Sequence, residues 1–309
     1  MRKLTVSQND ADQRLDRYLR KAFPRVPSAT IQKWLREKRV RINGVRASGD
    51  ARLSPGDELW LYIRDEFFDD EPREEDAFLL IENPSLDVVY EDAHIIICLK
   101  PSGLLSHPDE REKVNTLLTR IQAYLYRKGE YDPSADATFA PSLCHRIDRN
   151  TRGLVIAAKD AEALRFFEEQ IREHRIEKTY RALVHGAPRP ADGALESYIL
   201  RDREKKTVRV FDSPRPGALY AKTFYHTVER RGDVTLVECR LVTGRTHQIR
   251  AQFASIGCPL VGDGKYGTLA KGEKAGQMLC AYKLRFAFEP SGGTFDYLAG
   301  RVFEIDAGF

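Results

Sequence analysis

A short acidic run divides the chain into two parts of opposite character. Residues 65–76 read DEFFDDEPREED and are almost wholly acidic, whereas residues 1–63 carry a clear basic excess. Segregated charge of this kind is typical of a binding module that a linker joins to a separate domain. We therefore expect a small N-terminal domain over residues 1–63, an acidic linker over 64–85 and a larger domain over 86–309.

The first part has the pattern of two helices followed by a small sheet. Apolar residues recur at helical spacing over 12–22, with Asp12 as the expected N-terminal cap, and a second short helix should begin after Ser28. An Asn43-Gly44 pair between alternating residues predicts a tight hairpin, and a further strand is expected over 58–63. This pattern indicates a compact unit that ends where the acidic run begins.

Cations crowd around the second predicted helix and the hairpin, and only Glu37 offsets them. The six are Lys33, Arg36, Lys38, Arg39, Arg41 and Arg46. Charged runs are often no more than a solvated helix face. Because the hairpin would hold these cations on one side, we favour contact with phosphate, with an affinity that falls steeply as salt rises.

Beyond the linker, short strands adjoin one another and outnumber the helices. We expect helices over 161–171 and after Thr246, which is a candidate cap. The predicted strands cover 88–90, 95–99, 154–158, 180–184, 223–228, 234–242 and 282–288. This order favours the α+β class, with a mainly antiparallel mixed sheet and peripheral helices, beside the small N-terminal α/β domain.

Composition argues against several classes of protein. No apolar run approaches the roughly 20 residues that a membrane-spanning helix needs, and the N-terminus lacks the apolar core of a secretory signal. The five cysteines are odd in number and widely spaced, and they contain no CxxC pair, so neither a zinc site nor a disulfide framework is supported. We expect a monomeric cytoplasmic protein with reduced thiols and no membrane or metal partner.

Four stretches interrupt apolar elements with polar residues, at 100–103, 145–153, 178–180 and 243–250. The second stretch is a loop that leads into a buried strand, and it holds Asp148 between two arginines. Taken alone, an aspartate before a strand is most often a turn cap or a structural partner of an arginine such as Arg146. The joint occurrence of the four stretches argues for more.

The order and spacing of these motifs resemble the catalytic domain of the RluA-type RNA pseudouridine synthases. The runs that match are YEDxHIIIxLKPxGLLxH, HRIDxxTxGL, KxYxALVxG and TGRTHQIRxxFxxIGxPLxGDxxYG, within about residues 86–288. Residues 12–63, with VRING and a PGD turn, are similar to the S4-type RNA-binding domain. With this domain in front, the layout resembles the large-subunit ribosomal RNA members, particularly the RluC type.

The resemblance implies a cofactor-free isomerase that acts on a flipped-out uridine in RNA. It assigns the attacking carboxylate to Asp148, the cation beside it to Arg250, and the ring that stacks on uracil to Tyr180. Arg146 would occupy the space of the extruded base and offset part of the cost of flipping. The further contacts implied for RNA are Lys100, Arg245, His247 and Gln248.

The chemistry of pseudouridine formation accounts for these residue types. The bond from uracil nitrogen to ribose breaks, the base rotates, and it rejoins through carbon, so neither a cofactor nor a metal is implied. The carboxylate attacks the anomeric carbon or abstracts the neighbouring sugar proton to give a glycal, and both routes stay open. Either route needs an ionised carboxylate in a pocket that excludes water, beside a permanent cation.

Two positions depart from the family pattern, and three alternative functions compete with this interpretation. Ile147 stands where the family usually has leucine, and Arg152 replaces the usual serine, which adds a cation beside the loop. The alternatives are a noncatalytic RNA-binding or ribosome-assembly factor, a pseudouridine synthase that acts on transfer RNA, and a metal-dependent nuclease. The nuclease would use Asp148, Asp160 and Asp263, whose spacing does not match that of metal ligands.

Overall fold

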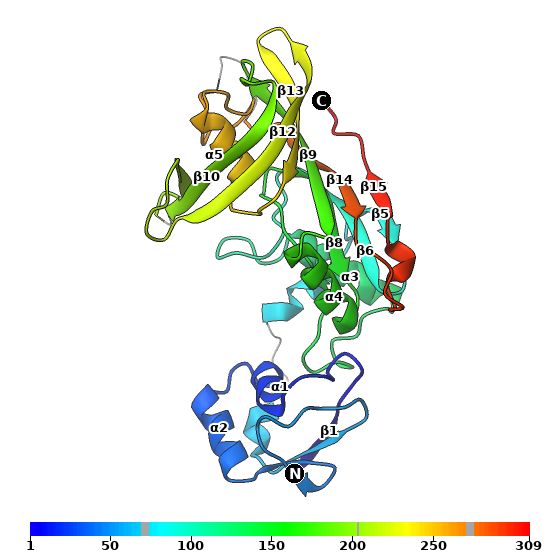
Figure 1. The fold of residues 1–309 in the computed structure, drawn as a ribbon. Coiled ribbons are helices and arrows are strands. Elements are labelled where there is room, and N and C mark those ends of the chain that lie inside the picture. The colour runs from blue at the N-terminus through cyan, green and yellow to red at the C-terminus, as the bar shows by residue number, and fades with distance from the viewer. Residues whose placement is uncertain (69–73, 203, 270–274) are drawn as a thin grey trace.

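The computed structural model describes residues 1–68, 74–202, 204–269 and 275–309. It contains a small N-terminal body and a larger body, which lie one above the other in Figure 1. Each body has its own hydrophobic core. The predicted acidic linker lies partly outside the described residues, and its described part includes two short 3-10 helices, η1 (Asp65–Phe68) and η2 (Glu74–Leu80).

The N-terminal body is a four-stranded sheet packed on two helices, in the strand order β1-β4-β2-β3. Its elements are β1 (Arg2–Thr5), α1 (Leu15–Ala22), α2 (Ser28–Arg36), β2 (Val40–Ile42), β3 (Val45–Arg46) and β4 (Glu58–Leu61). The helices form because their apolar residues fall on one face, which is fully buried at Leu15 and Ile31. The hairpin predicted at Asn43-Gly44 is confirmed, with φ values of 52° and 80°.

The cap predicted at Asp12 is wrong, because the helix begins two residues later than the pattern indicated. Arg14 occupies the N-cap position of α1 and makes no side-chain cap hydrogen bond. A nearby carboxylate, that of Asp10, is buried and caps no helix, because it binds backbone groups of the larger body. It accepts hydrogen bonds from the backbone nitrogens of Ala137 and Thr138 at 2.7 and 2.8 Å. This contact ties the N-terminal body to the larger one.

The larger body is built on one eleven-stranded sheet in the order β11-β10-β12-β13-β9-β14-β8-β6-β5, with β15 beside β14 and β7 beside β8 (Figure 1). Every pairing is antiparallel except that of β14 with β8. The mainly antiparallel mixed sheet predicted from the sequence is therefore confirmed. The strands are β5 (Asp87–Glu91), β6 (Ile95–Lys100), β7 (Ser142–Leu143), β8 (Arg152–Ala158), β9 (Ile176–His185), β10 (Asp192–Asp202), β11 (Thr207–Phe211), β12 (Leu219–Arg231), β13 (Val234–Leu241), β14 (Leu279–Phe286) and β15 (Val302–Glu304).

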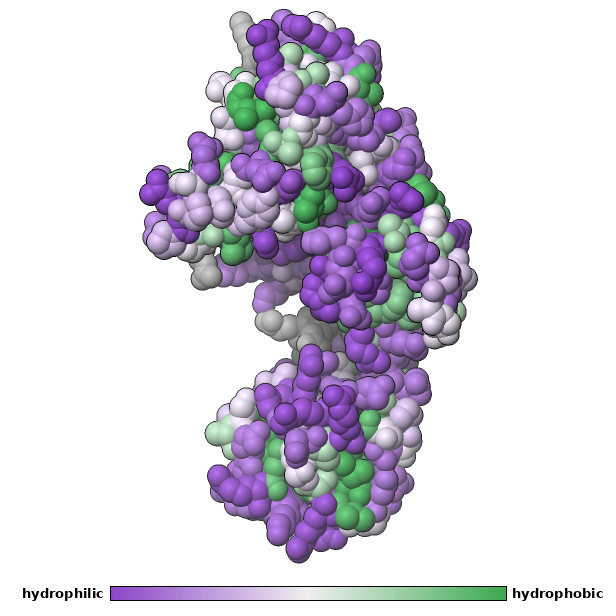
Figure 2. All heavy atoms as spheres, in the orientation of Figure 1, coloured by the Kyte–Doolittle hydropathy of each residue, from purple (hydrophilic) through white to green (hydrophobic). Residues whose placement is uncertain are grey.

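The helices of the larger body lie at the periphery of the sheet, as predicted. They are α3 (Leu117–Lys128), α4 (Ala161–Arg172), α5 (Gln248–Ser255) and the short η3 (Asp296–Leu298). The core between helices and sheet includes Phe167 of α4 and Phe253 of α5, both fully buried. Among the described residues, no helix is both long enough and apolar enough to cross a membrane. Figure 2 shows a surface in which hydrophilic residues predominate, hollowed between the two bodies.

Gly153 opens β8 at the point where that strand meets β14. A Cβ atom at this position would lie 2.5 Å from the carbonyl oxygen of Ala281. Only glycine allows so close an approach of the two backbones. The parallel pairing of β8 with β14 therefore holds the end of loop 145–152 against the sheet, beside β9.

Candidate active site

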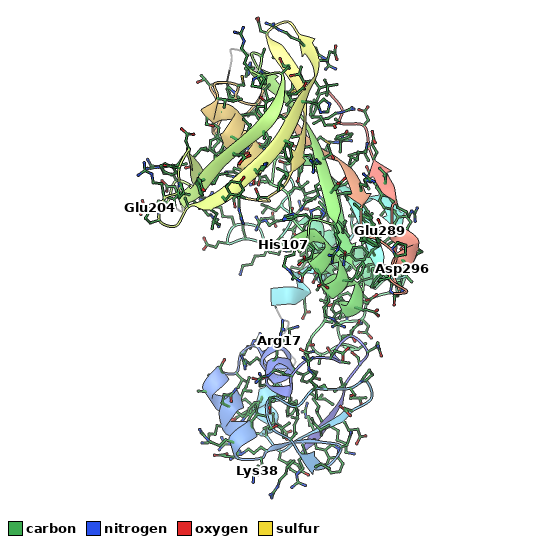
Figure 3. All side chains as sticks on the ribbon, viewed as in Figure 1. Arg17, Lys38, His107, Glu204, Glu289 and Asp296 are labelled. Atoms are coloured by element: carbon green, nitrogen blue, oxygen red, sulfur yellow. The ribbon has the colours of Figure 1, made fainter. Side chains whose placement is uncertain are left out.

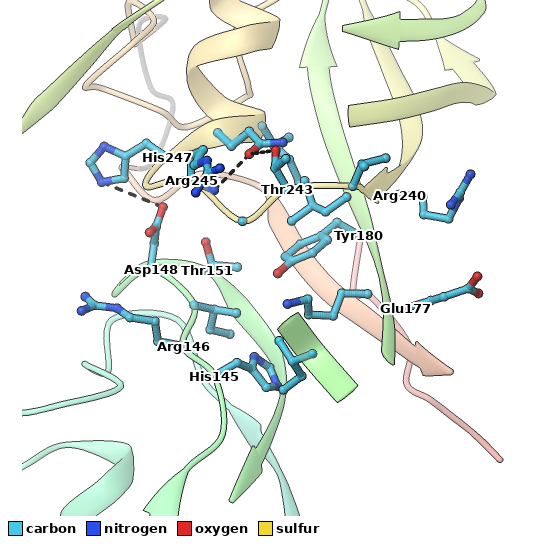
Figure 4. Close-up of a pocket in the computed structure, with 18 of the residues that line it drawn as sticks. His145, Arg146, Asp148, Thr151, Glu177, Tyr180, Arg240, Thr243, Arg245 and His247 are labelled. Atoms are coloured by element: carbon cyan, nitrogen blue, oxygen red, sulfur yellow. Dashed lines mark hydrogen bonds and ion pairs between the residues drawn. The ribbon is translucent and has the colours of Figure 1, made fainter. Parts of the chain in front are cut away.

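A pocket of about 490 Å³ opens where loop 145–152, strand β9 and helix α5 meet (Figure 4). This volume lies in the range of small-molecule sites. Three residues that the sequence motifs singled out, Asp148, Tyr180 and Arg250, all line it. They come from three different elements, and the sheet brings them together.

The carboxylate of Asp148 faces the N-terminal end of α5. One of its oxygens lies 3.3 Å from Nη1 of Arg250 and 3.9 Å from Nε2 of His247. The Asp148 side chain is 27% exposed, whereas the Arg250 side chain is 7% exposed. A ligand in the pocket can therefore reach the carboxylate, while the cation beside it is already withdrawn from water.

A second carboxylate fixes the orientation of Arg250. Nε and Nη2 of the guanidinium donate to the two oxygens of Asp263 at 2.7 and 2.8 Å, and the Asp263 side chain is only 1% exposed. Although burial opposes it, the pairing raises the pKa of Arg250 and lowers that of Asp263. Because this bidentate contact uses two of the three guanidinium nitrogens, the third is left to face Asp148.

His247 is held by a tyrosine of the loop that follows α5. Its Nδ1 lies 2.7 Å from the hydroxyl of Tyr266, which accepts a hydrogen bond from the backbone nitrogen of Val208 at 2.8 Å. The tyrosine hydroxyl can then donate to Nδ1, which leaves Nε2 protonated and directed at Asp148. Burial lowers the pKa of His247, and the charge of Arg250 adds to this effect. The imidazole is therefore neutral at neutral pH.

Tyr180 forms the wall opposite α5, at the centre of β9. It is 7% exposed, and its register places it between Cys239 of β13 and Ala281 of β14. Burial raises the pKa of its hydroxyl, and the charge of Asp148 adds to this effect. The phenol is therefore neutral at physiological pH, and its ring is held firmly by strands on both sides.

Comparison with known proteins agrees with this geometry. The sequence model of RNA pseudouridylate synthases matches residues 94–255, and that of the S4 domain matches residues 13–59. The chain belongs to the RNA pseudouridylate synthase family. It is 31% identical to the uncharacterized RNA pseudouridine synthase YlyB of Bacillus subtilis, over 96% of this chain and 93% of that protein. The enzyme predicted from the sequence motifs, an isomerase, is thereby confirmed.

Other relatives include enzymes named for the large ribosomal subunit. The ribosomal large subunit pseudouridine synthase D of Escherichia coli is 35% identical, over 85% of this chain and 75% of its own length. A structure of human RNA pseudouridylate synthase domain containing 4 shares the fold, with a TM-score of 0.54 and 19% identity over 71% of this chain and 88% of that one. The narrower likeness to the RluC type stays a prediction.

Two arginines lie at the rim of the synthase pocket, where the sequence analysis placed RNA contacts. Arg146 is exposed on the same loop as Asp148, and Arg245 is exposed just before α5. Nε of Arg245 donates to the carbonyl of Tyr220 at 3.0 Å, and its other guanidinium nitrogens make no hydrogen bond among the described residues. Both guanidinium groups can be reached by a strand of RNA that enters the pocket.

Two of the predicted RNA contacts are wrong, because their side chains serve the protein backbone. Lys100 is fully buried, and its ammonium donates to the carbonyls of Pro101, Leu104 and Arg149 at 2.9, 2.7 and 2.8 Å. Gln248 is buried as well. Its amide nitrogen donates to the carbonyl of Lys222, and its amide oxygen accepts from other protein groups. Both residues stabilise the loops around the site through hydrogen bonds within the protein.

Replacing Lys100 by methionine is expected to lower the free energy of unfolding by about 3 kcal/mol, because three carbonyls lose their common donor inside the protein. Chemical denaturation of the variant, beside an exposed control such as Lys205→Met, measures this loss. Weaker RNA binding with unchanged stability would instead return Lys100 to the role of a phosphate contact.

The cap predicted at Thr246 and the cation predicted from Arg152 also differ from expectation. The N-cap of α5 is His247, in the left-handed conformation with φ of 54° and without a side-chain cap bond. Arg152 does not line the pocket, since its Nη1 donates to the carbonyl of Asp306 near the C-terminus. The substitution for the usual serine therefore anchors the C-terminal segment and adds no cation to the site.

Sequence analysis missed several residues that complete the site. The metal-ligand hypothesis gives Asp263 a different role, and no prediction includes Tyr266, although both lie in the GDxxYG run. The signal in the sequence was that the GDxxYG run follows the RTHQIR run within one and the same family motif. Among the described residues, no group of three or more histidines, cysteines or carboxylates is arranged to hold a metal ion.

Proposed function

We propose that this synthase converts one or more uridines of large-subunit ribosomal RNA to pseudouridine, with Asp148 as the attacking group. The observation that carries the proposal is the chain of contacts from Asp263 through Arg250 to Asp148, in a pocket walled by Tyr180. The ribosomal substrate is supported by the S4 domain and by relatives named for the large subunit. The monomeric state and the cytoplasmic location stay predictions.

Each group of the pocket has a role in this reaction. Arg250, held by Asp263, lies 3.3 Å from the carboxylate of Asp148, which attacks C1′ or removes the proton from C2′. The Tyr180 ring gives uracil an apolar surface on which to stack. Flipping the nucleotide costs a few kcal/mol, and Arg146 at the rim can fill the space it leaves and contact phosphate.

The proposal is tested by tritium release from RNA that carries uridine labelled at carbon 5. We expect the purified synthase to release tritium from large-subunit RNA fragments, with or without a chelator in monovalent salt. Carbodiimide-blocked primer extension in cells with and without the gene then locates the modified uridine. Modification confined to transfer RNA would overturn the ribosomal assignment, and strand cleavage that a chelator abolishes would identify a nuclease.

The basic surface of the N-terminal domain is expected to supply salt-dependent affinity. Of its six cations, Lys33 and Arg39 pair with Glu37 at 3.8 and 2.7 Å. Arg36, Lys38 and Arg46 are exposed and have no ion-pair partner among the described residues. In Figure 3 Lys38 lies at the end of the N-terminal body far from the larger one, whereas Arg17 faces the larger body. An RNA that reaches both Lys38 and the pocket must therefore extend along the molecule from one body to the other.

Changing Arg36, Lys38 and Arg46 together to glutamine should reduce the slope of log affinity against log salt by about 2, because each phosphate contact contributes roughly 0.7 to 0.9. Filter binding at several salt concentrations measures the slope. The matched control exchanges lysine and arginine at the same positions and keeps the charge. An equal slope for both variants would mean that this face is only solvated.

A further inference from the structure

Among the hydrogen-bond donors that line the pocket and that the mechanism above does not use, two are largely withdrawn from water. One is the ammonium of Lys178 on β9, and the other is a ring nitrogen of His145, just after β7. Both line the same cavity as Asp148 and Tyr180. Donors that are withdrawn from water without acceptors cost free energy, so their presence calls for an explanation.

The protonation of His145 follows from its contacts. Its Nε2 accepts a hydrogen bond from the backbone nitrogen of Ile156 at 3.2 Å, so this nitrogen carries no proton. Burial lowers the pKa of the imidazole to about 3, and the charge of Lys178 adds to this effect. The neutral ring therefore carries its hydrogen on Nδ1. That nitrogen is buried and has no hydrogen-bond partner among the described residues.

Lys178 has no counter-charge within the part of the chain that the structure describes. Among the described residues, its ammonium makes neither a hydrogen bond nor an ion pair, and burial alone lowers its pKa. In Figure 4 the carboxylate of Asp148 points toward His247, whereas His145 lies below the ring of Tyr180, away from that carboxylate. Lys178 and Tyr180 are two residues apart on one strand, which directs their side chains to the same face.

We propose that Lys178, with His145 beside it, binds the carbonyl edge of the uracil and stabilises the negative charge that the base acquires when it leaves the ribose. This inference rests on the proposed function, which places uracil on Tyr180 and the ribose at Asp148. A base held in that way spans the pocket from the carboxylate to the two donors. The exposed arginines at the rim, Arg146 and Arg245, are then free to contact the phosphates of the RNA.

The electron balance of the reaction explains why such donors would help. When the bond from C1′ to N1 breaks, its electron pair passes to the uracil ring and spreads onto the two carbonyl oxygens. When C5 rejoins C1′, the base loses its C5 proton and N1 gains one, so the product is an isomer and Lys178 keeps its proton throughout. Donors fixed in a dry pocket gain most where charge develops, which lowers the barrier more than it tightens binding.

The test compares Lys178→Met with Lys178→Arg and with the surface control Lys205→Met, on one RNA stem-loop with uridine or 5-fluorouridine at the target. Methionine should slow single-turnover cleavage of the uridine by about 10²-fold, as the loss of a preorganised donor does elsewhere. The RNA dissociation constant should change less than about twofold, since the contact forms mainly in the transition state. Arginine should restore part of the rate, and the surface control should match the wild type.

Fluorine makes uracil a weaker base and a better leaving group, so it should need the cation less. The rate loss caused by methionine should therefore shrink by about tenfold on 5-fluorouridine, in keeping with catalysis by charge stabilisation. Equal losses on both substrates would indicate a structural role, and weaker binding at an unchanged rate would indicate a phosphate contact; either result overturns the inference. A wild-type protein inactive on uridine would instead defeat the proposed function itself.

Discussion

Replacing Asp148 by asparagine is expected to abolish pseudouridine formation while RNA binding survives. The amide has nearly the same shape, but it can neither attack C1′ nor remove a proton from C2′. We expect the single-turnover rate to fall by at least about 10⁴-fold, the scale seen when an enzyme loses its nucleophile. Tritium release from uridine labelled at carbon 5 measures this rate directly.

Binding of RNA by the Asp148→Asn variant separates loss of chemistry from loss of fold. The side chain keeps 27% of its exposure and contacts Arg250 at 3.3 Å, so an amide of equal size disturbs little packing. Its RNA dissociation constant should equal that of the wild type or fall slightly, because a negative charge leaves the pocket. Asp212→Asn, an exposed position outside the pocket, is the matched control. Retained tritium release by Asp148→Asn would remove this residue from the mechanism.

The arrangement of the pocket could be predicted from the sequence only through motifs. The spacing of residues along the chain does not show which distant residues meet or how deeply their side chains are buried. Asp148 and Arg250 are 102 residues apart, and they meet because loop 145–152 and α5 flank the same strands. Local pattern correctly located most strands around them. It missed α3, whose capping box joins Thr116 to Thr119 in place of the usual acidic or amide partner.

The errors at Lys100 and Gln248 have one physical cause. A polar residue inside a family motif can contact a ligand, or it can form hydrogen bonds with buried backbone groups. Both roles place the residue beside the site. Lys100 donates to three carbonyls of its own loops, which no linear pattern encodes. The same ambiguity concealed Lys178, because a half-buried lysine at the edge of a core is common. Its lack of partners among the described residues is visible only in the structure.

Replacing Arg250 by methionine is expected to lower both stability and activity, and a second substitution should separate the two effects. Without its cation, the Asp263 carboxylate stays 1% exposed with only backbone donors from residues 265 and 266. An uncompensated charge at such a site costs about 3–5 kcal/mol of unfolding free energy. In Arg250→Met/Asp263→Asn that charge is gone, so most of the stability should return. Activity should stay at least about 10²-fold below the wild type in both variants, because Asp148 has lost its cation.

The pH dependence of unfolding identifies the group responsible. In the wild type Arg250 lowers the pKa of Asp263, so the stability from this pair is present above the usual aspartate pKa and is lost as pH falls. In Arg250→Met the guanidinium no longer opposes burial, which outweighs the two remaining backbone donors and raises the pKa of Asp263 above its unfolded value. The folded variant then binds the extra proton, and its deficit relative to the wild type should shrink between pH 8 and pH 5. Urea denaturation at both pH values measures this change. A deficit independent of pH, or activity recovered in the double variant, would show that Arg250 acts through packing and not through charge.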